Sequence, residues 1–220
     1  MKRDYLYQHK DGIFIFILYS FYAVGVLGHL VDKTFPLMII LTPFVLLVFG
    51  LAVLLRTTGR DCKLLLWCLA AYMFTFAAEA IGVHSGLIFG EYYYGNTLGL
   101  KLLGVPAVIG FNWVIVVLGA IALARKISHK LLFSALLAAL FTAIFDIPLE
   151  IVAVNLDYWQ WSGGFVPFQN YAAWFVVAFI VALSFNYLKL ETKGKAIIHY
   201  FFIQFFFFIL IDLMILIDLL

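Results

Sequence analysis

The most unusual chemistry in the sequence lies in the stretch LFTAIFDIPLEIVAVNL, residues 140–156. This run is almost wholly apolar, yet it holds Asp146, Pro148 and Glu150 within five positions. Residues four apart on a helix share a face, so we expect the two carboxyl groups to be neighbours. Pro148 lacks an amide hydrogen, so we expect the helix to bend or end there, which lipid tolerates only where the freed carbonyl is buried in protein or lines a cavity. The stretch therefore indicates a polar pocket inside an apolar protein.

Two further acidic residues, Glu79 and Asp212, lie deep inside other apolar runs. A charged side chain near the middle of a bilayer costs about 2.5–3.5 kcal/mol on insertion scales, so it needs a partner, a wet cavity or a function. With a rise of 1.5 Å per residue, Glu79, Asp146 and Asp212 fall roughly 22–24 Å from the cytoplasmic ends of their spans. We therefore expect them in one layer of the outer half of the membrane, where they either bridge helices or surround a reactive cavity. Asp212 favours the bridging role, because no other polar residue accompanies it.

Carboxyl groups in such a cavity are suited to paired acid and base chemistry. Burial disfavours the charged form, and two carboxyl groups close together cannot easily both ionise. A neutral carboxylic acid can then donate a proton while its ionised neighbour accepts one. We expect no metal site, since His84 has no second His or Cys at ligand spacing, and we expect no organic cofactor.

The composition explains why these acids stand out. Of the 220 residues, 66% are hydrophobic and 12% are charged, which is too apolar for an ordinary soluble domain. A helix needs roughly 20 apolar residues to cross a hydrocarbon core about 30 Å thick, and a spanning backbone must bond to itself. We predict an all-α integral membrane protein, a single polytopic domain over residues 1–220 built as a bundle of about seven transmembrane helices. The predicted spans are about 13–31, 35–55, 64–83, 104–124, 131–153, 170–188 and 196–217.

The basic residues predict the orientation of these spans. Twelve of the 14 Lys and Arg residues fall before the first span or in alternate loops after it, and the other loops hold only Lys33 and Lys101. The positive-inside rule then places the N-terminus in the cytoplasm and the C-terminus outside, in the cell membrane. The charges are spread over short loops, so they indicate topology and not a nucleic-acid-binding patch.

Two of the predicted outer loops, residues 84–103 and 154–169, are rich in Gly and aromatic residues. Aromatic side chains with a polar tip settle at the headgroup level of a membrane, but loops of this composition can also fold back as a lid over a cavity. The rings concerned are Tyr92, Tyr93, Tyr94, Trp159 and Trp161.

Four segments in order resemble a known family. They are EAIGVHSGLIFGEYYYG (79–95), GVPAVIGFNW (104–113), FDIPLEIVAV (145–154) and YWQWSGGFVPFQNYAAWF (158–175). Together they resemble the carotenoid biosynthesis hydratases that act on γ-carotene or bisanhydrobacterioruberin, over about residues 70–185. The resemblance implies a membrane hydro-lyase that adds water to the terminal double bond of an open-chain carotenoid end group and leaves a tertiary alcohol.

The residues fit this chemistry. An acid must protonate the less substituted alkene carbon, and water must capture the resulting tertiary cation. We assign Asp146 as the proton donor, with Glu79 and Glu150 holding the water and taking the proton back, while the choice of donor among the three stays open. Asn112 and Asn170 are expected to anchor the water or the product hydroxyl. The aromatic faces expected to stabilise the cation are those of Trp113, Tyr92, Tyr94 and Trp161.

Two other functions remain open. A carotenoid cyclase, or another isoprenoid-modifying membrane enzyme, needs the same acids but captures the cation with an internal double bond. A proton-coupled transporter also uses buried acids, although the sequence has no inverted repeat of the kind such folds often show. The expected partners are an isoprenoid substrate and membrane lipid, with association with other enzymes of the pathway left open.

Overall fold

The computed structural model describes residues 2–217, with side chains from residue 11 onward. Within this range, seven helices are long and apolar enough to cross a membrane, which confirms the predicted number of spans. The helices are α1 (Lys2–His29), α2 (Phe35–Thr58), α3 (Cys62–Ser85), α4 (Ala107–Ile127), α5 (Leu131–Asn155), α6 (Phe168–Tyr187) and α7 (Ala196–Leu216).

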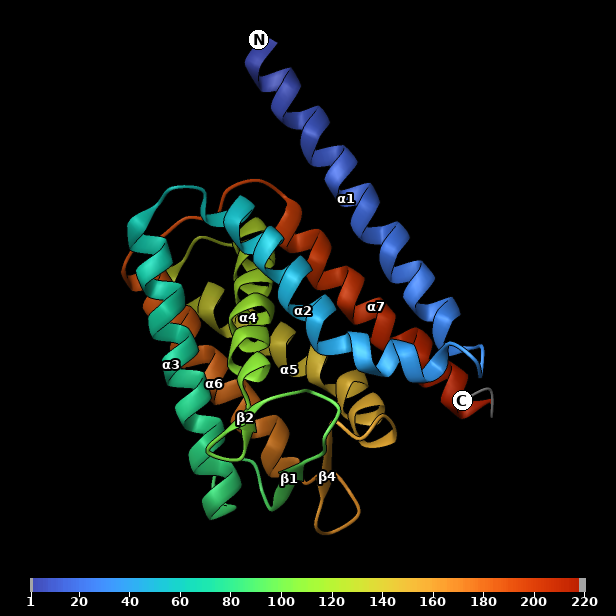
Figure 1. Ribbon diagram of the computed structural model, residues 1–220. Coiled ribbons are helices and arrows are strands. Elements are labelled where there is room, and N and C mark those ends of the chain that lie inside the picture. The colour runs from blue at the N-terminus through green and yellow to red at the C-terminus, as the bar shows by residue number, and fades with distance from the viewer. Residues whose placement is uncertain (1, 218–220) are drawn as a thin grey trace.

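Helix α4 is the centre of the bundle. Most of its side chains are buried, and α2, α3, α5, α6 and α7 all contact it, as the arrangement in Figure 1 shows. It begins at Ala107, three residues later than predicted, because Val105–Pro106 (β3) forms a short hairpin with Lys101–Leu102 (β2). Helix α1 lies at the edge of the bundle, mainly along α7.

Helix α5 runs through Pro148 without ending there. It continues to Asn155, and Pro148 itself is buried. Of the two outcomes expected at the proline, a bend or an end of the helix, the structure excludes the end, and the expected placement of Asp146 and Glu150 on one face of a helix holds. Both side chains are almost fully buried.

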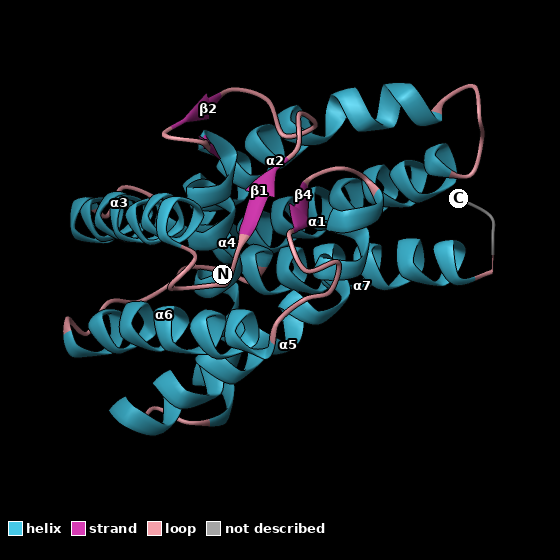
Figure 2. Ribbon diagram, turned by 90° about the horizontal axis from the view of Figure 1, so that it is seen from below, coloured by secondary structure: helices cyan, strands magenta, loops and turns pink. Residues whose placement is uncertain are grey.

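The two aromatic loops join at one end of the bundle. Tyr92–Tyr94 (β1) pairs antiparallel with Trp159–Trp161 (β4), and Tyr93 lies opposite Gln160. Successive side chains of a strand point to opposite faces. Tyr92, Tyr94, Trp159 and Trp161 accordingly point inward and are buried, whereas Tyr93 is 59% exposed. Figure 2 looks onto this end and shows the two strands lying across it, so four of the five rings belong to a lid and not to an aromatic belt.

The lid depends on close packing of the two loops. The Gly95 amide donates to the Tyr158 carbonyl, and a Cβ at Gly95 would lie 2.1 Å from the carbonyl oxygen of Asp157. Any larger residue at position 95 would push the loops apart. A further hydrogen bond joins β2 to β1, since Nζ of Lys101 donates to the Tyr94 carbonyl at 2.7 Å.

The orientation that the basic residues predict can be tested by cysteine labelling. In a variant with both native cysteines replaced, Tyr93→Cys should react with a membrane-impermeant maleimide applied to intact cells, because Tyr93 is exposed on the predicted outer lid. In the protein that keeps its native cysteines, Cys62, which is exposed at the start of α3, should react only after the cells are permeabilised. The opposite pattern of labelling would reverse the assigned topology.

Candidate active site

Glu79 of α3 is held by three hydrogen-bond donors. Its Oε2 accepts from the hydroxyls of Tyr92 at 2.5 Å and Tyr94 at 2.8 Å, and its Oε1 accepts from the indole Nε1 of Trp113 at 2.7 Å. Two of the donors come from the lid and one from α4. A buried carboxyl group needs this number of partners, because leaving it unpaired costs about 1–3 kcal/mol or more.

The local sequence of α3 makes room for this arrangement. Gly82 lies one turn beyond Glu79, and a Cβ at Gly82 would meet the ring of Phe89 at 2.6 Å. The absence of a side chain there lets Phe89 pack over the helix, edge-to-face with Tyr92. The small residues around Glu79 thus allow the lid to approach its carboxyl group.

Burial, and secondarily the neighbouring Glu79 carboxyl, raise the pKa of both Tyr92 and Tyr94 above the ordinary value. Both tyrosines are therefore neutral phenols that can donate a proton in a hydrogen bond, or accept one. The indole of Trp113 can only donate.

Glu150 of α5 is held by three nitrogen donors. Its Oε2 accepts from the indoles of Trp159 and Trp161, each at 2.9 Å, and its Oε1 accepts from Nδ2 of Asn170 at 2.8 Å. Indole N–H groups cannot accept a hydrogen bond, and neither can the amide nitrogen of Asn170. The surroundings of Glu150 are therefore suited to an ionised carboxylate.

Asp146 lies one helical turn before Glu150 and shares a donor with it. Nδ2 of Asn170 donates to Oδ2 of Asp146 at 2.7 Å, and the other oxygen, Oδ1, is buried without a hydrogen-bond partner among the described residues. With a single donor and an acidic neighbour, Asp146 is suited to the neutral form. No salt bridge joins Glu79, Asp146 or Glu150 to a basic side chain in the part of the chain whose side chains are described.

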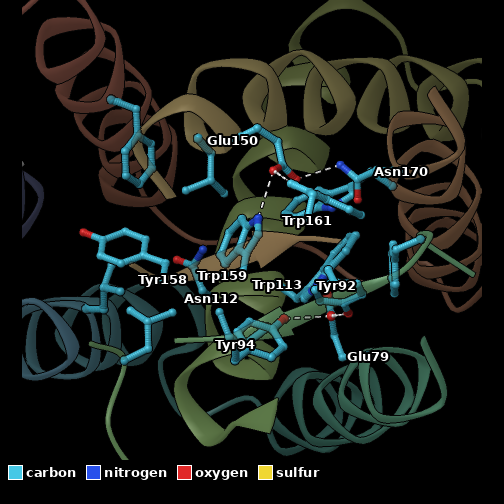
Figure 3. A pocket seen from close by; sticks show the side chains of 17 residues that line it. Glu79, Tyr92, Tyr94, Asn112, Trp113, Glu150, Tyr158, Trp159, Trp161 and Asn170 are labelled. Atoms are coloured by element: carbon cyan, nitrogen blue, oxygen red, sulfur yellow. Dashed lines mark hydrogen bonds between the residues drawn. The ribbon is translucent and has the colours of Figure 1, made fainter. Parts of the chain in front are cut away.

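Glu79 and Glu150 line one small cavity beneath the lid, with a volume of about 40 Å³. Figure 3 shows the two carboxyl groups on opposite sides of a group of aromatic rings. Trp113 is stacked on Trp174 of α6 with ring centroids 3.8 Å apart. The other polar or aromatic lining residues are Phe89, Tyr92, Tyr94, Asn112, Tyr158, Trp159, Trp161, Asn170 and Phe208.

A second hollow, of about 320 Å³, reaches Glu150 and Trp161 from another side. Its lining includes the polar side chains of Asn155 and Gln160 together with Val154 and Phe165. Glu150 is thus the acid of the cavity that also borders a more polar space.

Most of the predicted site residues meet at this cavity, but two of the predicted acids do not line it. Asp146 does not line the cavity, but it accepts a hydrogen bond from Asn170, which does. Asp212 is not among the lining residues, and its Oδ1 has no hydrogen-bond partner in the described structure. A convergence of acids from three helices on this cavity was one of two possibilities, and it does not include Asp212, for which a role between helices was favoured.

Two other polar residues of the loops and helix ends, His84 and Glu91, lie outside the cavity. His84 bonds to the Ala80 carbonyl through Nδ1 at 2.8 Å, and Glu91 is exposed. Among the described residues, no group of three or more His, Cys, Asp or Glu side chains is placed to hold a metal ion. Asn112 lines the cavity and accepts a long contact of 3.5 Å from Nε2 of Gln204.

Trp159 and Trp174 are site residues whose roles were not predicted. Trp159 was interpreted only as an interfacial ring or part of a lid, and it proves to donate to Glu150. The signal for it was the alternation Trp159–Gln160–Trp161, in which two residues of one type share a face if the segment is a strand.

The fold and the site define a multi-pass membrane protein with an acid-lined cavity closed by a small aromatic sheet. The chain belongs to the carotenoid biosynthesis protein family, whose sequence profile matches residues 34–219. The bisanhydrobacterioruberin hydratase of Haloarcula japonica is 32% identical to it over 128 residues, which cover 54% of this chain. The match spans 43% of the length of that relative. No solved structure matches the chain.

Asn170 is expected to be the most important neutral residue for the stability of the site. Replacing Asn170 by Leu removes the donor that Asp146 and Glu150 share, so the free energy of unfolding should fall by about 1–3 kcal/mol. Asn155→Leu is the matched control, because Asn155 is exposed and its side chain bonds only to the Ile151 carbonyl. Thermal unfolding of the two purified variants in detergent would measure the difference, and equal melting temperatures would contradict the assigned role.

Proposed function

We propose that this protein adds water to the terminal double bond of an open-chain carotenoid end group. The observation that carries the proposal is the pair of carboxyl groups on opposite sides of one aromatic cavity, Glu79 and Glu150, each held by neutral donors. Membership of a carotenoid biosynthesis family supports the substrate class, and the relative named as a hydratase supports the reaction.

The contacts of the two acids suit different roles. A protonated Glu79 can give its hydrogen bond to Tyr92 or Tyr94, since a phenol oxygen accepts as well as donates. A protonated Glu150 has no such acceptor among its three partners. We therefore assign Glu79 as the proton donor and Glu150 as the base, which departs from the expectation that Asp146 donates, because the donor must touch the alkene and Asp146 does not line the cavity.

The reaction then proceeds in two steps. Glu79 transfers its proton to the less substituted carbon of the terminal double bond, which leaves a cation on the carbon that carries the two methyl groups. A water molecule held by Glu150 adds to that carbon and gives a proton to Glu150, so that the product is a tertiary alcohol. The hollow beside Glu150 supplies the water, and proton transfer through water returns the acids to their starting forms.

The aromatic lining can stabilise the cation of the proposed reaction. The faces of Trp113, Tyr92 and Trp161 present negative quadrupole potential, and a desolvated cation over such a face gains about 2 kcal/mol or more. These rings stay unreactive while the cation awaits water. Asp146 stays neutral beside Glu150. It helps to position Glu150, because both acids accept a hydrogen bond from Asn170.

Pigment analysis tests the proposal. Expressed in a host that accumulates an open-ended carotene, the protein should raise the mass of the pigment by one water for each modified end. Glu79→Gln and Glu150→Gln should each lower product by about 100-fold or more, because each amide keeps the shape of the side chain but cannot exchange the proton. Asp146→Asn should lower product less than either.

Glu91→Gln is the control, since Glu91 is exposed on the same loop as the lid tyrosines. All variants are compared at equal amounts of protein in the membrane. A changed pigment of unchanged mass would indicate a cyclase instead. Unchanged pigment in several such hosts, or full activity of both Gln variants, would overturn the proposal.

A further inference from the structure

The acid cavity is too small for the substrate that the proposed function requires. Its volume of about 40 Å³ accommodates a few water molecules, not an isoprenoid end group. A much larger space of about 280 Å³ lies next to it, between α1, α2 and α7. The two are adjacent because Leu46, Tyr158 and Phe208 line both.

The larger space is mainly apolar. Its walls include Phe21 and Gly25 of α1, Met38 and Val45 of α2, and Phe207 of α7. Its volume is close to the lower limit of small-molecule sites, about 300–1,000 Å³. It borders lipid-facing helices, so a ligand can reach it from the membrane without crossing water.

Two buried polar side chains that line this mainly apolar space, His29 and Gln204, each have an atom without a hydrogen-bond partner among the described residues, Nε2 and Oε1 respectively. His29 is 4% exposed, and its Nδ1 lies 2.7 Å from the Gly25 carbonyl. A carbonyl can only accept, so Nδ1 carries the hydrogen, and the other ring nitrogen, Nε2, is an acceptor. Nε2 has no hydrogen-bond partner in the described structure, so it requires a donor such as a water molecule beside an apolar chain in this space.

Helix α1 supplies one wall of the space and lies outside the residues that match the family, 34–219. This wall is therefore a feature of the present chain beyond what the family profile covers. The acid cavity, in contrast, is built wholly from residues within that range.

We propose that the space between α1, α2 and α7 binds the apolar chain of a linear isoprenoid next to its reacting end, and that Leu46, Tyr158 and Phe208 separate to admit that end to the acids. The inference rests on the proposed function for the identity of the reacting end. Leu46 and Phe208 are apolar, and burial raises the pKa of Tyr158 to about 12, so this phenol is neutral. A wall of uncharged side chains can move aside for an alkene without exposing a charge.

Filling the space tests the proposal. At Gly25 an added Cβ would meet only the Phe207 ring, at 3.6 Å, which is an ordinary contact, so Gly25→Leu fills the space without a backbone clash. Gly12→Leu is the matched control, because it makes the same change on the same helix, where an added Cβ meets no atom within 4 Å. Val45→Phe fills the space from the opposite wall and guards against a folding defect that is peculiar to Gly25.

The probe is lycopene, a linear carotene with two open ends, and the readout is its visible absorbance per mole of purified protein. Each change is made in the Glu79→Gln background, which keeps the ligand unconverted. The Gly12→Leu protein should retain lycopene at the level of its parent, while Gly25→Leu and Val45→Phe should each retain at least fivefold less.

Equal retention by all the variants, or no retention by the parent, would overturn the inference. If retention in the Glu79→Gln background depends on Gly25, but the protein with native Glu79 leaves the pigment mass unchanged, hydration is overturned while the binding site stands. The two proposals therefore fail separately.

Discussion

The structure depends on the requirement that a carboxyl group buried in a membrane protein be surrounded by hydrogen-bond donors. Removing a carboxyl group from water without replacing its hydrogen bonds is among the larger penalties that a fold can carry. Here six donor contacts answer that requirement for Glu79 and Glu150, and four of them come from the lid. The small sheet is thus the source of the donors as well as a cover.

The pairing of β1 with β4 follows from the same requirement. Each strand alternates, with two inward rings around one outward residue, and each delivers two polar tips to a single carboxyl oxygen. A shift of one residue in β1 would turn Tyr93 inward and leave Glu79 short of partners, and the same shift in β4 would turn Gln160 inward and do so for Glu150. The acids therefore select the register of the lid, and the lid in turn closes the cavity.

Hydropathy alone was enough to predict the number of helices, since each span is a long apolar run, and the spacing of four residues was enough to place Asp146 beside Glu150. Depth was predicted for Asp212, but rotation about the helix axis was not, and rotation decides which side chains meet. A lid was one interpretation of the two aromatic loops, but the pairing of its strands was beyond reach for a different reason. Its strands are three residues long and 67 positions apart from Tyr92 to Trp159 by the chain numbering, so no local pattern distinguishes their pairing from two independent loops.

The choice of donors also bears on the chemistry. Arg or Lys could have neutralised Glu79 and Glu150, but a fixed positive charge would hold both acids ionised and would repel the carbocation of the proposed reaction. Phenol, indole and amide groups stabilise a carboxylate without adding charge. The indole of Trp161 and the phenol of Tyr92 each supply a donor at the edge and a π face for the cavity, with their ring centroids 5.1 Å apart. For the proposed reaction, an aromatic donor is therefore the kind of partner that satisfies the acid beforehand and tolerates a cation during it, which fits the concentration of Tyr and Trp around these two side chains.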